Sequence, residues 1–421
     1  MKYNRSVYDG NMAFSYVIDE KFKTSSLIIR FITPLDGGKA ADNAMGICIL
    51  SDSCKKYNSI AKMNEKCSSL YGASVNSGVR KLGDLQILNF SASWINNRYA
   101  IDGEDITGEM LDIVCNCIFE PNAQNGKFED ESFKITKNEL LDKIESEINN
   151  KRGYAISRAS ASAFKNEPAE NPCYGTKEAA EAADPESAFA AYRNLIETAQ
   201  IEICFIASEE NPAVQERLMQ EFSKIKRVSP ENTFRSLSPS KNVTERVSEE
   251  FDVNQSKMVL VFKTDFADRY ALKIMNMIFG ETPVSKLFMN VREKLSLCYY
   301  CASKISYSKG AVIVDSGVEK ENIQKAEEEI LRQLDEIKNG NFTDDEINSA
   351  LLSVDNALAS IGDTPSSYSS WYFDCLCRDE FLTPEQVMEK YKAVSRDDII
   401  NAAKSLKLDT VYLMLNKEDK E

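Results

Sequence analysis

A helical pattern followed by an alternating strand pattern occurs twice in this sequence, and this repetition limits the fold more than any other feature. Residues 184–207 predict a capped helix and then a strand with apolar residues at every second position. Residues 395–416 repeat that order, with the strand at residues 411–415. The offset is about 210 residues, half of the chain. We therefore predict a duplicated α+β domain. A doubly wound sheet is disfavoured because strands and helices mix without strict βαβ alternation.

A polar connector separates the two halves. Residues 227–247 contain many Ser, Pro and Asn residues with little periodicity, including Ser229-Pro230 and Ser238-Pro239. A chain of 421 residues is too long for one ordinary core and fits two domains of about 200 residues each. We predict a first domain at residues 1–225, a linker at 226–244 and a second domain at 245–421.

Charge and apolar runs argue against two classes of partner. The net charge is −15, and no run of Lys and Arg is present that could neutralise phosphates or an anionic membrane surface. The longest apolar runs are the length of a strand, far too short to span a membrane. The N-terminus has no apolar segment of the secretory type, so the eleven cysteines are interpreted as reduced thiols. We expect a cytoplasmic protein that binds neither nucleic acid nor membrane.

The sequence contains no histidine. This absence removes the Ser-His-Asp triad, the Cys-His dyad and every zinc site that uses a histidine ligand.

One stretch of the second half resembles a known family. Residues 279–317 contain a glycine turn, then Ser285-Lys286-Leu287-Phe288, then Arg292-Glu293-Lys294, then Leu297-Cys298-Tyr299. This order is similar to the C-terminal domain of the pitrilysin/insulinase-type zinc peptidases, the family that includes the mitochondrial processing peptidases. The resemblance implies two domains of similar topology, each a mixed sheet with helices packed on it, that face each other around a chamber.

The resemblance also implies that the family's zinc-binding motif is missing from this sequence. Active members carry the motif HxxEH on a helix, in which two His bind zinc and the Glu is the general base. Residues 55–59 resemble the segment after that motif, which places the motif at about residues 44–48, where Ala44, Ile47 and Cys48 stand. Three glutamates on a later helix are expected to lie on a solvated face: Glu139, Glu145 and Glu147. The resemblance therefore implies a non-catalytic member with no metal and no cofactor.

Two residues of the family's substrate site are kept. In active relatives an Arg and a Tyr of the second domain reach toward the zinc, bind the substrate backbone and help to stabilise the oxyanion. The matching positions here are Arg292 and Tyr299, and a guanidinium and a phenol are suitable donors toward developing negative charge. The alternative is that Arg292 forms a structural salt bridge and Tyr299 is a partly buried strand residue.

The hypothesis that follows is a subunit of a paired peptidase. A homologous zinc-bearing partner would supply the metal, and this chain would supply the Arg292 and Tyr299 side of a shared chamber for a peptide or unfolded polypeptide. One alternative is a stand-alone peptide-binding or scaffold protein, since a short bacterial branch of the family is associated with elongation factor P modification. Another is an enzyme with altered chemistry in the old cavity.

Two further motifs have ordinary interpretations. Cys298-Tyr299-Tyr300-Cys301 has the spacing of a redox motif, but it falls at the start of a predicted strand, whereas redox activity requires a helix N-terminus. The aromatic residues between 368 and 373 either line a peptide-binding surface or fill a core.

Overall fold

The computed structural model describes residues 1–228 and 230–417, so Ser229 of the predicted connector lies outside the described residues. The chain forms two compact units, and each takes one segment from the other half of the sequence. Unit 1 comprises Met1–Glu145, Asn171–Thr233 and Gly362–Phe373. Unit 2 comprises Ser146–Glu170, Phe234–Ile361 and the chain from Asp374 on.

Unit 1 is built on a six-stranded sheet in the order β1-β2-β8-β3-β5-β4. Strands β2 and β8 are parallel, and all other neighbours are antiparallel. The strands are β1 Lys2–Tyr8, β2 Met12–Ile18, β3 Thr24–Pro34, β4 Ser74–Leu82, β5 Leu85–Ile95 and β8 Gln200–Ala207. A separate hairpin pairs β6 (Ala123–Gln124) with β7 (Lys127–Phe128).

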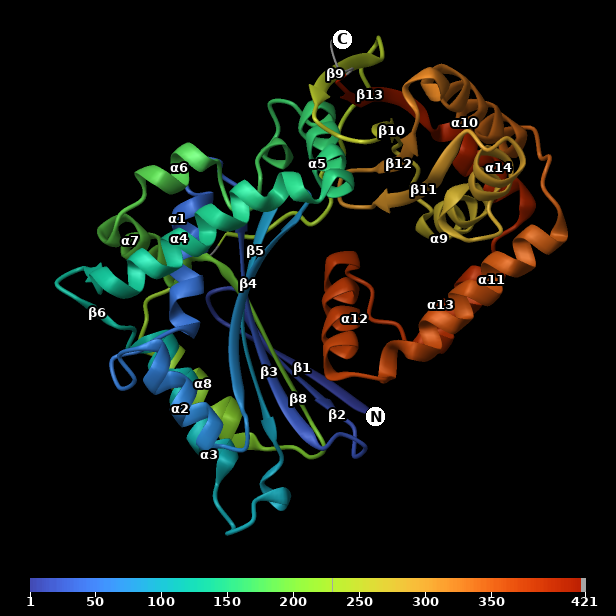
Figure 1. Ribbon diagram of the computed structural model, residues 1–421. Helices are drawn as coiled ribbons and strands as arrows, with labels where there is room; N and C mark the ends of the chain where they lie inside the picture. The colour runs from blue at the N-terminus through green and yellow to red at the C-terminus, as the bar shows by residue number, and fades with distance from the viewer. Residues whose placement is uncertain (229, 418–421) are drawn as a thin grey trace. The chain divides into compact units, whose positions relative to one another are not determined.

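Helices cover one face of this sheet (Figure 1). Alternate residues of β3, Leu27, Ile29 and Phe31, are almost fully buried in the core between sheet and helices. This alternation is the period of a strand with two different faces. The helices are α1 Ala40–Cys48, α2 Ile60–Ser69, α3 Ile106–Phe119, α4 Asp130–Ser146, α6 Lys177–Ala182, α7 Pro185–Thr198 and α8 Pro212–Ser223.

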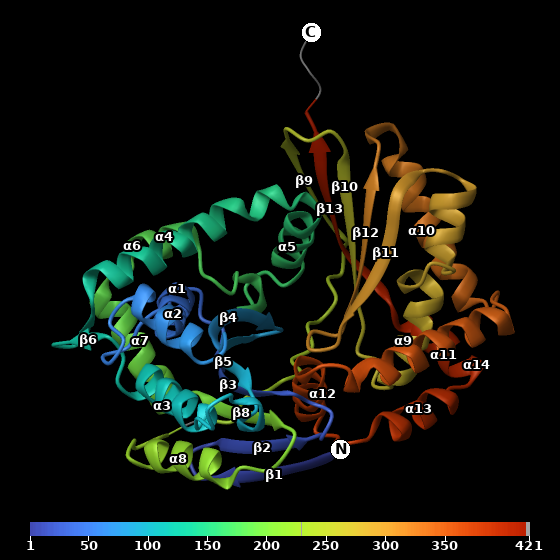
Figure 2. The same cartoon turned by 60° about the horizontal axis from the view of Figure 1, so that its bottom comes forward.

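Unit 2 is built on a five-stranded sheet in the order β11-β12-β10-β13-β9, with β13 and β9 parallel. The strands are β9 Glu245–Phe251, β10 Ser256–Lys263, β11 Cys298–Ser306, β12 Ala311–Val318 and β13 Lys407–Asn416. The remaining helices are α5 Lys151–Ala163, α9 Arg269–Asn276, α10 Ile323–Lys338, α11 Asp344–Ala359, α12 Pro365–Arg378, α13 Pro384–Lys392 and α14 Arg396–Ser405. Figure 2 shows this sheet with α10 beside it and α5 on its other side.

The predicted duplication is confirmed by the strand order. Reading β2-β8-β3-β5-β4 against β9-β13-β10-β12-β11 gives the same order, with the parallel pair at the same end. In each unit the helix before the last strand, α7 or α14, begins with a capping box, at Asp184 and at Ser395. The fold is mixed α+β with two units of similar topology, and unit 1 adds β1 at one edge.

Each unit receives a helix from the other half of the chain. In unit 2, three alanines of α5 (Ala155, Ala159 and Ala163) are buried against the second face of the sheet, where Val259 and Val261 of β10 lie. Alanine at every fourth position places a smooth stripe on one helix face, so the helix packs closely on the sheet. The neighbouring residues of β10, Met258, Leu260 and Phe262, belong to the core on the opposite face. Strand β10 is therefore covered on both sides.

Unit 1 receives the first part of α12. Arg30 of β3 points away from the helix-side core and donates to Ser369 Oγ at 2.5 Å, and its guanidinium lies 4.8 Å from the ring centroid of Phe373. Tyr372 stacks on Tyr3 of β1 with ring centroids 3.7 Å apart. The aromatic residues of 368–373 therefore pack on the second face of this sheet. The predicted division at residues 226–244 treats each half as continuous and does not include these two exchanged segments.

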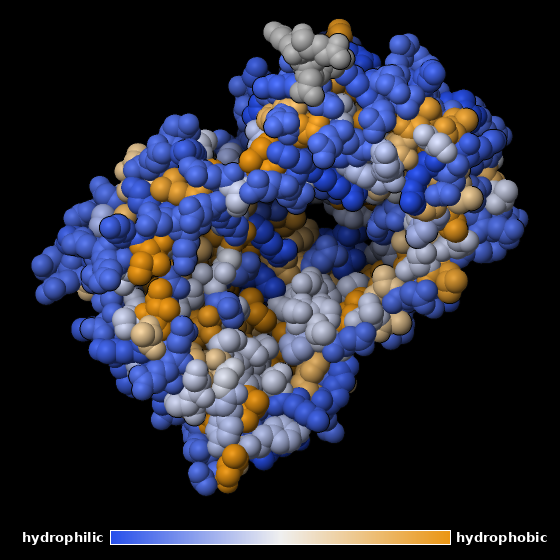
Figure 3. Space-filling view, in the orientation of Figure 1, coloured by the Kyte–Doolittle hydropathy of each residue, from blue (hydrophilic) through white to orange (hydrophobic). Residues whose placement is uncertain are grey.

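The hydrophilic surface agrees with a sequence in which 28% of the residues are charged. Figure 3 shows one face, on which hydrophilic residues dominate and apolar residues are scattered. Among residues 1–228 and 230–417, no helix has both the length and the apolar character needed to cross a membrane.

Candidate functional site

The positions that match the family's zinc motif lie on α1 and offer almost no donor atoms. Ile47 is fully buried in the core of unit 1, as is Ala44. Cys48 is the one potential ligand, and burial raises the pKa of its thiol above the ordinary value. A cysteine binds zinc as a thiolate, so this shift works against metal binding.

A small pocket of about 180 Å³ lies beside this helix, within unit 1. Its lining comes from α1, the turn after it, β4, α4 and the segment before α6: Ala44, Met45, Cys48, Asp52, Ser77, Thr136, Glu139, Leu140, Lys143 and Tyr174. Glu139, expected on a solvated face, is exposed but also borders this pocket, whereas Glu145 and Glu147 are simply exposed.

The acidic groups of the pocket do not make a zinc site. Burial and then the negative charge of Glu139 raise the pKa of Asp52 to about 6, although Thr136 Oγ1 donates to its Oδ2 at 3.3 Å. Within the described part of the chain, no three His, Cys, Asp or Glu side chains come together as a metal-binding group. One protonated thiol, one alanine and two separated carboxylates do not fit the tetrahedral nitrogen and sulfur ligands that zinc prefers.

Replacing Asp52 with Asn is expected to stabilise the protein at neutral pH. Because the folded pKa of about 6 lies above the value of about 3.9 for an unfolded Asp, the ionised carboxylate costs about 1–3 kcal/mol at pH 7. That cost decreases as the pH falls through the folded pKa. Urea unfolding should therefore show a larger gain for Asp52→Asn at about pH 7 than at about pH 5. An equal gain at both values would contradict a raised pKa. As a matched control, Asp142→Asn on the exposed side of α4 should change little at either pH.

Arg292 lies in unit 2, on the π-helical segment Leu287–Lys294 that precedes β11. Its guanidinium carbon lies 4.5 Å from the ring centroid of Phe288, one turn earlier, and its Nη1 lies 3.5 Å from the carboxylate of Glu293. Both members of that ion pair are well exposed, at 40% and 50% of the side-chain surface. Exposed pairs contribute little to stability. The structural salt bridge considered as the alternative is therefore a weak surface pair.

Tyr299 lies at the start of β11 and points outward. Its exposed fraction is 68%, and no hydrogen bond of its hydroxyl is found among the described residues. It is thus an exposed strand residue, not the partly buried one that the alternative assumed. Its neighbour Tyr300 behaves differently, because its ring lies under the guanidinium of Arg152, 4.5 Å away, and burial raises the pKa of its phenol.

The turn between these two elements is fixed by the backbone. Ser296 has φ of 49°, in the left-handed region that L-residues adopt at a cost of roughly 1 kcal/mol. The N–H of Leu295 donates to Asn290 O at 3.1 Å, and that of Leu297 donates to Val291 O at 3.0 Å. A register shift between Cys298 and Tyr300 then begins the strand. The structure therefore places Arg292 and Tyr299 on either side of one hydrogen-bonded turn.

The flanking cysteines lie in the interior. Cys298 and Cys301 are 8% and 3% exposed, and a hydrogen bond with Cys301 lowers the pKa of Cys298 to about 7. A strand position with little exposure does not resemble the helix N-terminus of redox enzymes.

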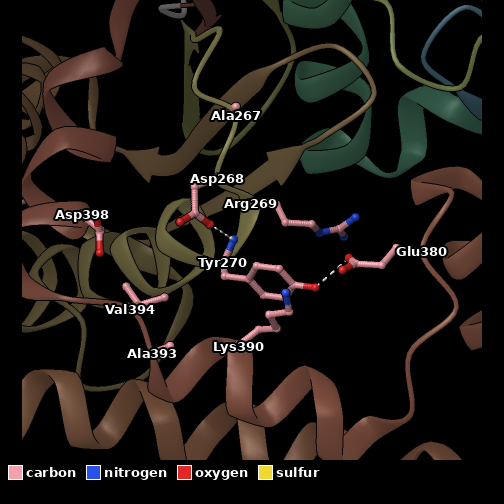
Figure 4. A pocket seen from close by; sticks show the side chains of 9 residues that line it. All are labelled: Ala267, Asp268, Arg269, Tyr270, Glu380, Lys390, Ala393, Val394 and Asp398. Carbon is pink, nitrogen blue, oxygen red and sulfur yellow. Dashed lines mark hydrogen bonds between the residues drawn. The ribbon is translucent and has the colours of Figure 1, made fainter.

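A larger pocket, of about 410 Å³, lies elsewhere in unit 2 between α9, α13 and α14 (Figure 4). Its carboxylates already have partners. Asp268 accepts from the N–H of Tyr270 at 2.9 Å, and Glu380 accepts from the hydroxyl of Tyr270 at 2.8 Å. Neither Arg292 nor Tyr299 lines this pocket, so it is separate from the predicted site.

Comparisons with known proteins agree with this fold. Residues 183–353 match the family model described as "Peptidase M16 inactive domain". A curated relative from Bacillus subtilis (strain 168), named "Probable inactive metalloprotease YmfF", is 27% identical over 415 residues, and the alignment covers 97% of each chain.

Two solved structures extend the comparison. A conserved protein from Enterococcus faecalis V583 is 27% identical, covers 100% of both chains and superposes with a TM-score of 0.92. A structure from Pseudomonas fluorescens, described as a peptidase M16 inactive domain, is 14% identical and superposes with a TM-score of 0.81 over 100% of both chains.

The fold is metallopeptidase-like, and within residues 1–228 and 230–417 the positions that match the zinc motif are not accompanied by a metal-binding group. The predicted resemblance is confirmed: residues 183–353 match the M16 inactive domain, and the whole chain is similar to proteins of the M16, or pitrilysin/insulinase-type, metallopeptidase family, one of which is named a probable inactive metalloprotease.

Proposed function

We propose that this chain is the non-catalytic subunit of a paired M16-type peptidase and supplies Arg292 and Tyr299 to substrate bound near a partner's zinc. The observation that carries the proposal is the contrast between the two sites. The zinc-motif positions hold Ala44, Ile47 and Cys48, whereas Arg292 and Tyr299 expose donor groups. Among the described residues, Arg292 forms an exposed ion pair with Glu293, and no hydrogen bond of the Tyr299 hydroxyl is found.

The chemistry of such a pair divides naturally between two chains. The partner's zinc would activate water for attack on a peptide carbonyl. The guanidinium of Arg292 and the phenol of Tyr299 would donate to the substrate backbone and to the negative charge that develops on the carbonyl oxygen. Such donors accelerate hydrolysis only when they are held in position, and we propose that the turn between the π-helical segment Leu287–Lys294 and β11 holds them in this way.

Co-purification from the native host tests the proposal. The tagged chain is expected to bring down a homologue that carries an intact HxxEH motif, and the complex should contain zinc and hydrolyse peptides. The lone chain should do neither. If the chain purifies without such a homologue and still binds peptides tightly, the stand-alone binding or scaffold function replaces the paired peptidase. We also propose a cytoplasmic location, because a chain with eleven cysteines and no disulfide among the described residues fits a reducing compartment.

A further inference from the structure

The face of the unit 2 sheet on which α5 packs carries charged residues where that helix leaves it uncovered. The buried cluster under α5 contains residues of β10, β12 and β13 but none of β11, the strand at the edge of the sheet. Residues two apart in a strand point to the same face. Cys301 and Ile305 of β11 contact the core on the opposite face, so Tyr300 and Lys304 lie on the face of α5. Lys304 is exposed and Tyr300 is partly exposed.

Strand pairing brings two further cations to Tyr300. Lys257 of β10 and Tyr300 of β11 both pair with Gly317 of β12, so the three residues form one row across the sheet. A Cβ atom on Gly317 would lie 2.5 Å from the Tyr300 ring, which shows that this ring lies over the glycine. Nζ of Lys257 lies 5.6 Å from the ring centroid, and the guanidinium of Arg152 lies 4.5 Å from it. We call Arg152, Lys257, Tyr300 and Lys304 the cationic face.

Of the three cations, Arg152 has a carboxylate partner. Its Nη2 donates to Oδ1 of the buried Asp315 at 3.1 Å, and its Nε donates to Oδ2. Nζ of Lys257 donates to Oε1 of Gln255 at 2.7 Å, and no hydrogen bond or ion pair of Lys304 is found among the described residues. Loss of hydration lowers the pKa of both lysines below the ordinary value, and the charge of Arg152 adds to this effect. Both ammonium groups would therefore gain from an anion.

We propose that the cationic face binds an acidic segment of an extended polypeptide, whose carboxylates at alternate positions reach Lys257 and Lys304. The ring of Tyr300 lies between the two lysines and would contact the side-chain stems of the segment. This inference rests on the proposed function, because a polypeptide is the substrate proposed there. It adds the class of sequence that is selected, through residues other than Arg292 and Tyr299.

An extended acidic segment fits better than a single phosphate for a geometric reason. Lys304 lies four residues along β11 from Tyr300, about 13 Å, and Lys257 lies two strands away, about 10 Å. The bond from Lys257 to Gln255 directs its ammonium group further from Lys304, since Gln255 precedes β10. One compact anion would reach only one lysine. Alternate side chains of an extended peptide lie about 7 Å apart on one face, so two or three carboxylates span the distance.

The charge of the whole protein makes the expected binding specific to this face. The chain carries −15 and repels an acidic ligand from most of its surface. One carboxylate besides Asp315 influences the cationic face, namely Glu319, which follows β12 and raises the pKa of Lys257. The three cations exceed these two carboxylates, so the local charge is positive.

Isothermal titration calorimetry with the full chain tests the proposal. The probe is an eight-residue peptide in which alanine and glutamate alternate, with both termini blocked. Saturable binding is expected at about 50 mM salt, and about 300 mM salt should weaken it several-fold through screening. The double change Lys257→Gln and Lys304→Gln should weaken binding about tenfold or more, because two charge-assisted contacts are lost. Lys257→Arg with Lys304→Arg keeps both charges and should stay within about threefold.

The matched control is Lys325→Gln with Lys338→Gln, which removes two charges from α10 on the opposite face of the sheet. This double variant should bind within about twofold of the unchanged protein. Thermal unfolding of all variants should stay close to that of the unchanged protein. The peptide with glutamine in place of glutamate should not bind.

Three results would overturn the proposal. One is unchanged binding by the Lys257→Gln, Lys304→Gln variant, or no saturable binding up to about 1 mM peptide. Another is equal binding of a peptide with its four glutamates consecutive, because the spacing would then not be recognised. The third is tighter binding of an eight-nucleotide single-stranded DNA through the same lysines, which would make nucleic acid the ligand.

The proposed function and this inference can fail separately. If a zinc-bearing partner co-purifies and the complex hydrolyses peptides without regard to acidic residues, the inference fails and the paired peptidase stands. If the lone chain binds the acidic peptide through Lys257 and Lys304 and no such partner exists, the paired peptidase fails and the cationic face stands.

Discussion

Replacing Asp409 with alanine is expected to destabilise the protein by about 3–5 kcal/mol, the usual cost of leaving a buried charge without its partner. The Asp409 side chain is fully buried at the start of β13. It lies 3.4 Å from Nζ of Lys263, which is 3% exposed, and 3.3 Å from Nζ of Lys241. The N–H of Lys241 and the hydroxyl of Thr410 also donate to it, each at 2.8 Å. Alanine would leave Lys263 buried beside a second cation.

The acid dependence of stability should follow from the same carboxylate. Burial alone would raise the pKa of Asp409, but the hydrogen bonds from Lys241 and Thr410 and the two nearby ammonium groups outweigh burial and hold its pKa below the ordinary value. A lowered folded pKa means that the contribution is present above about pH 4 and is lost as the pH falls through the folded pKa. Urea unfolding at about pH 7 and at about pH 3 should show a smaller effect of Asp409→Ala at the lower pH.

A second change separates the buried charge from simple loss of contacts. Adding Lys263→Met to Asp409→Ala should recover part of the lost stability, because the double variant no longer contains a buried ammonium group without its carboxylate. Glu389→Ala serves as the matched control, since Glu389 and Lys392 form an exposed pair on α13 and should contribute less than about 1 kcal/mol. If both carboxylate deletions had the same effect, the charge of Asp409 would not be what stabilises unit 2.

The sequence could predict the duplication but not the exchange of helices. The helix-strand pattern before β8 and before β13 depends on neighbouring residues, so periodicity and caps reveal it. The placement of α5 and α12 depends on contacts between residues far apart in the chain. Ala155 and Ala159 show a small-residue stripe, but nothing in that stripe identifies Val259 of β10 as its contact. The aromatic residues of α12 left open whether they fill a core or line a binding surface, and the sequence did not identify the sheet on which they pack.

The candidate site shows a similar limit. The motif around Arg292 could be found because its spacing is local. The sequence could not predict whether Tyr299 or Tyr300 points outward, because a register shift at Cys298 sets which face of β11 each residue occupies. Asp52 was missed for another reason. It has no motif, and its raised pKa arises only when the fold buries its carboxyl and brings it beside Glu139 of α4.

In the assembled complex, Arg292→Ala is expected to reduce peptide hydrolysis by roughly 100- to 1000-fold, or about 2.7–4 kcal/mol of transition-state stabilisation. The reason is that its guanidinium would donate to charge that exists only in the transition state, so the loss should appear in kcat more than in KM. Stability should change little, because the head group is well exposed and its ion pair with Glu293 is weak. The measurement is steady-state hydrolysis by the reconstituted complex, with thermal unfolding of the lone chain beside it.

Tyr299→Phe distinguishes a donor at this site from a side chain that merely packs there. The change removes one hydroxyl and keeps the ring, and the exposed hydroxyl contributes no contact to the fold. A fall in kcat of about tenfold, smaller than that for Arg292→Ala, would mark a neutral donor that acts beside a charged one. Arg332→Gln on α10 should leave hydrolysis unchanged, since that guanidinium pairs with Glu329 at 2.7 Å. Full activity of the complex with Arg292→Ala would mean that the partner supplies its own oxyanion donors and that this turn serves binding alone.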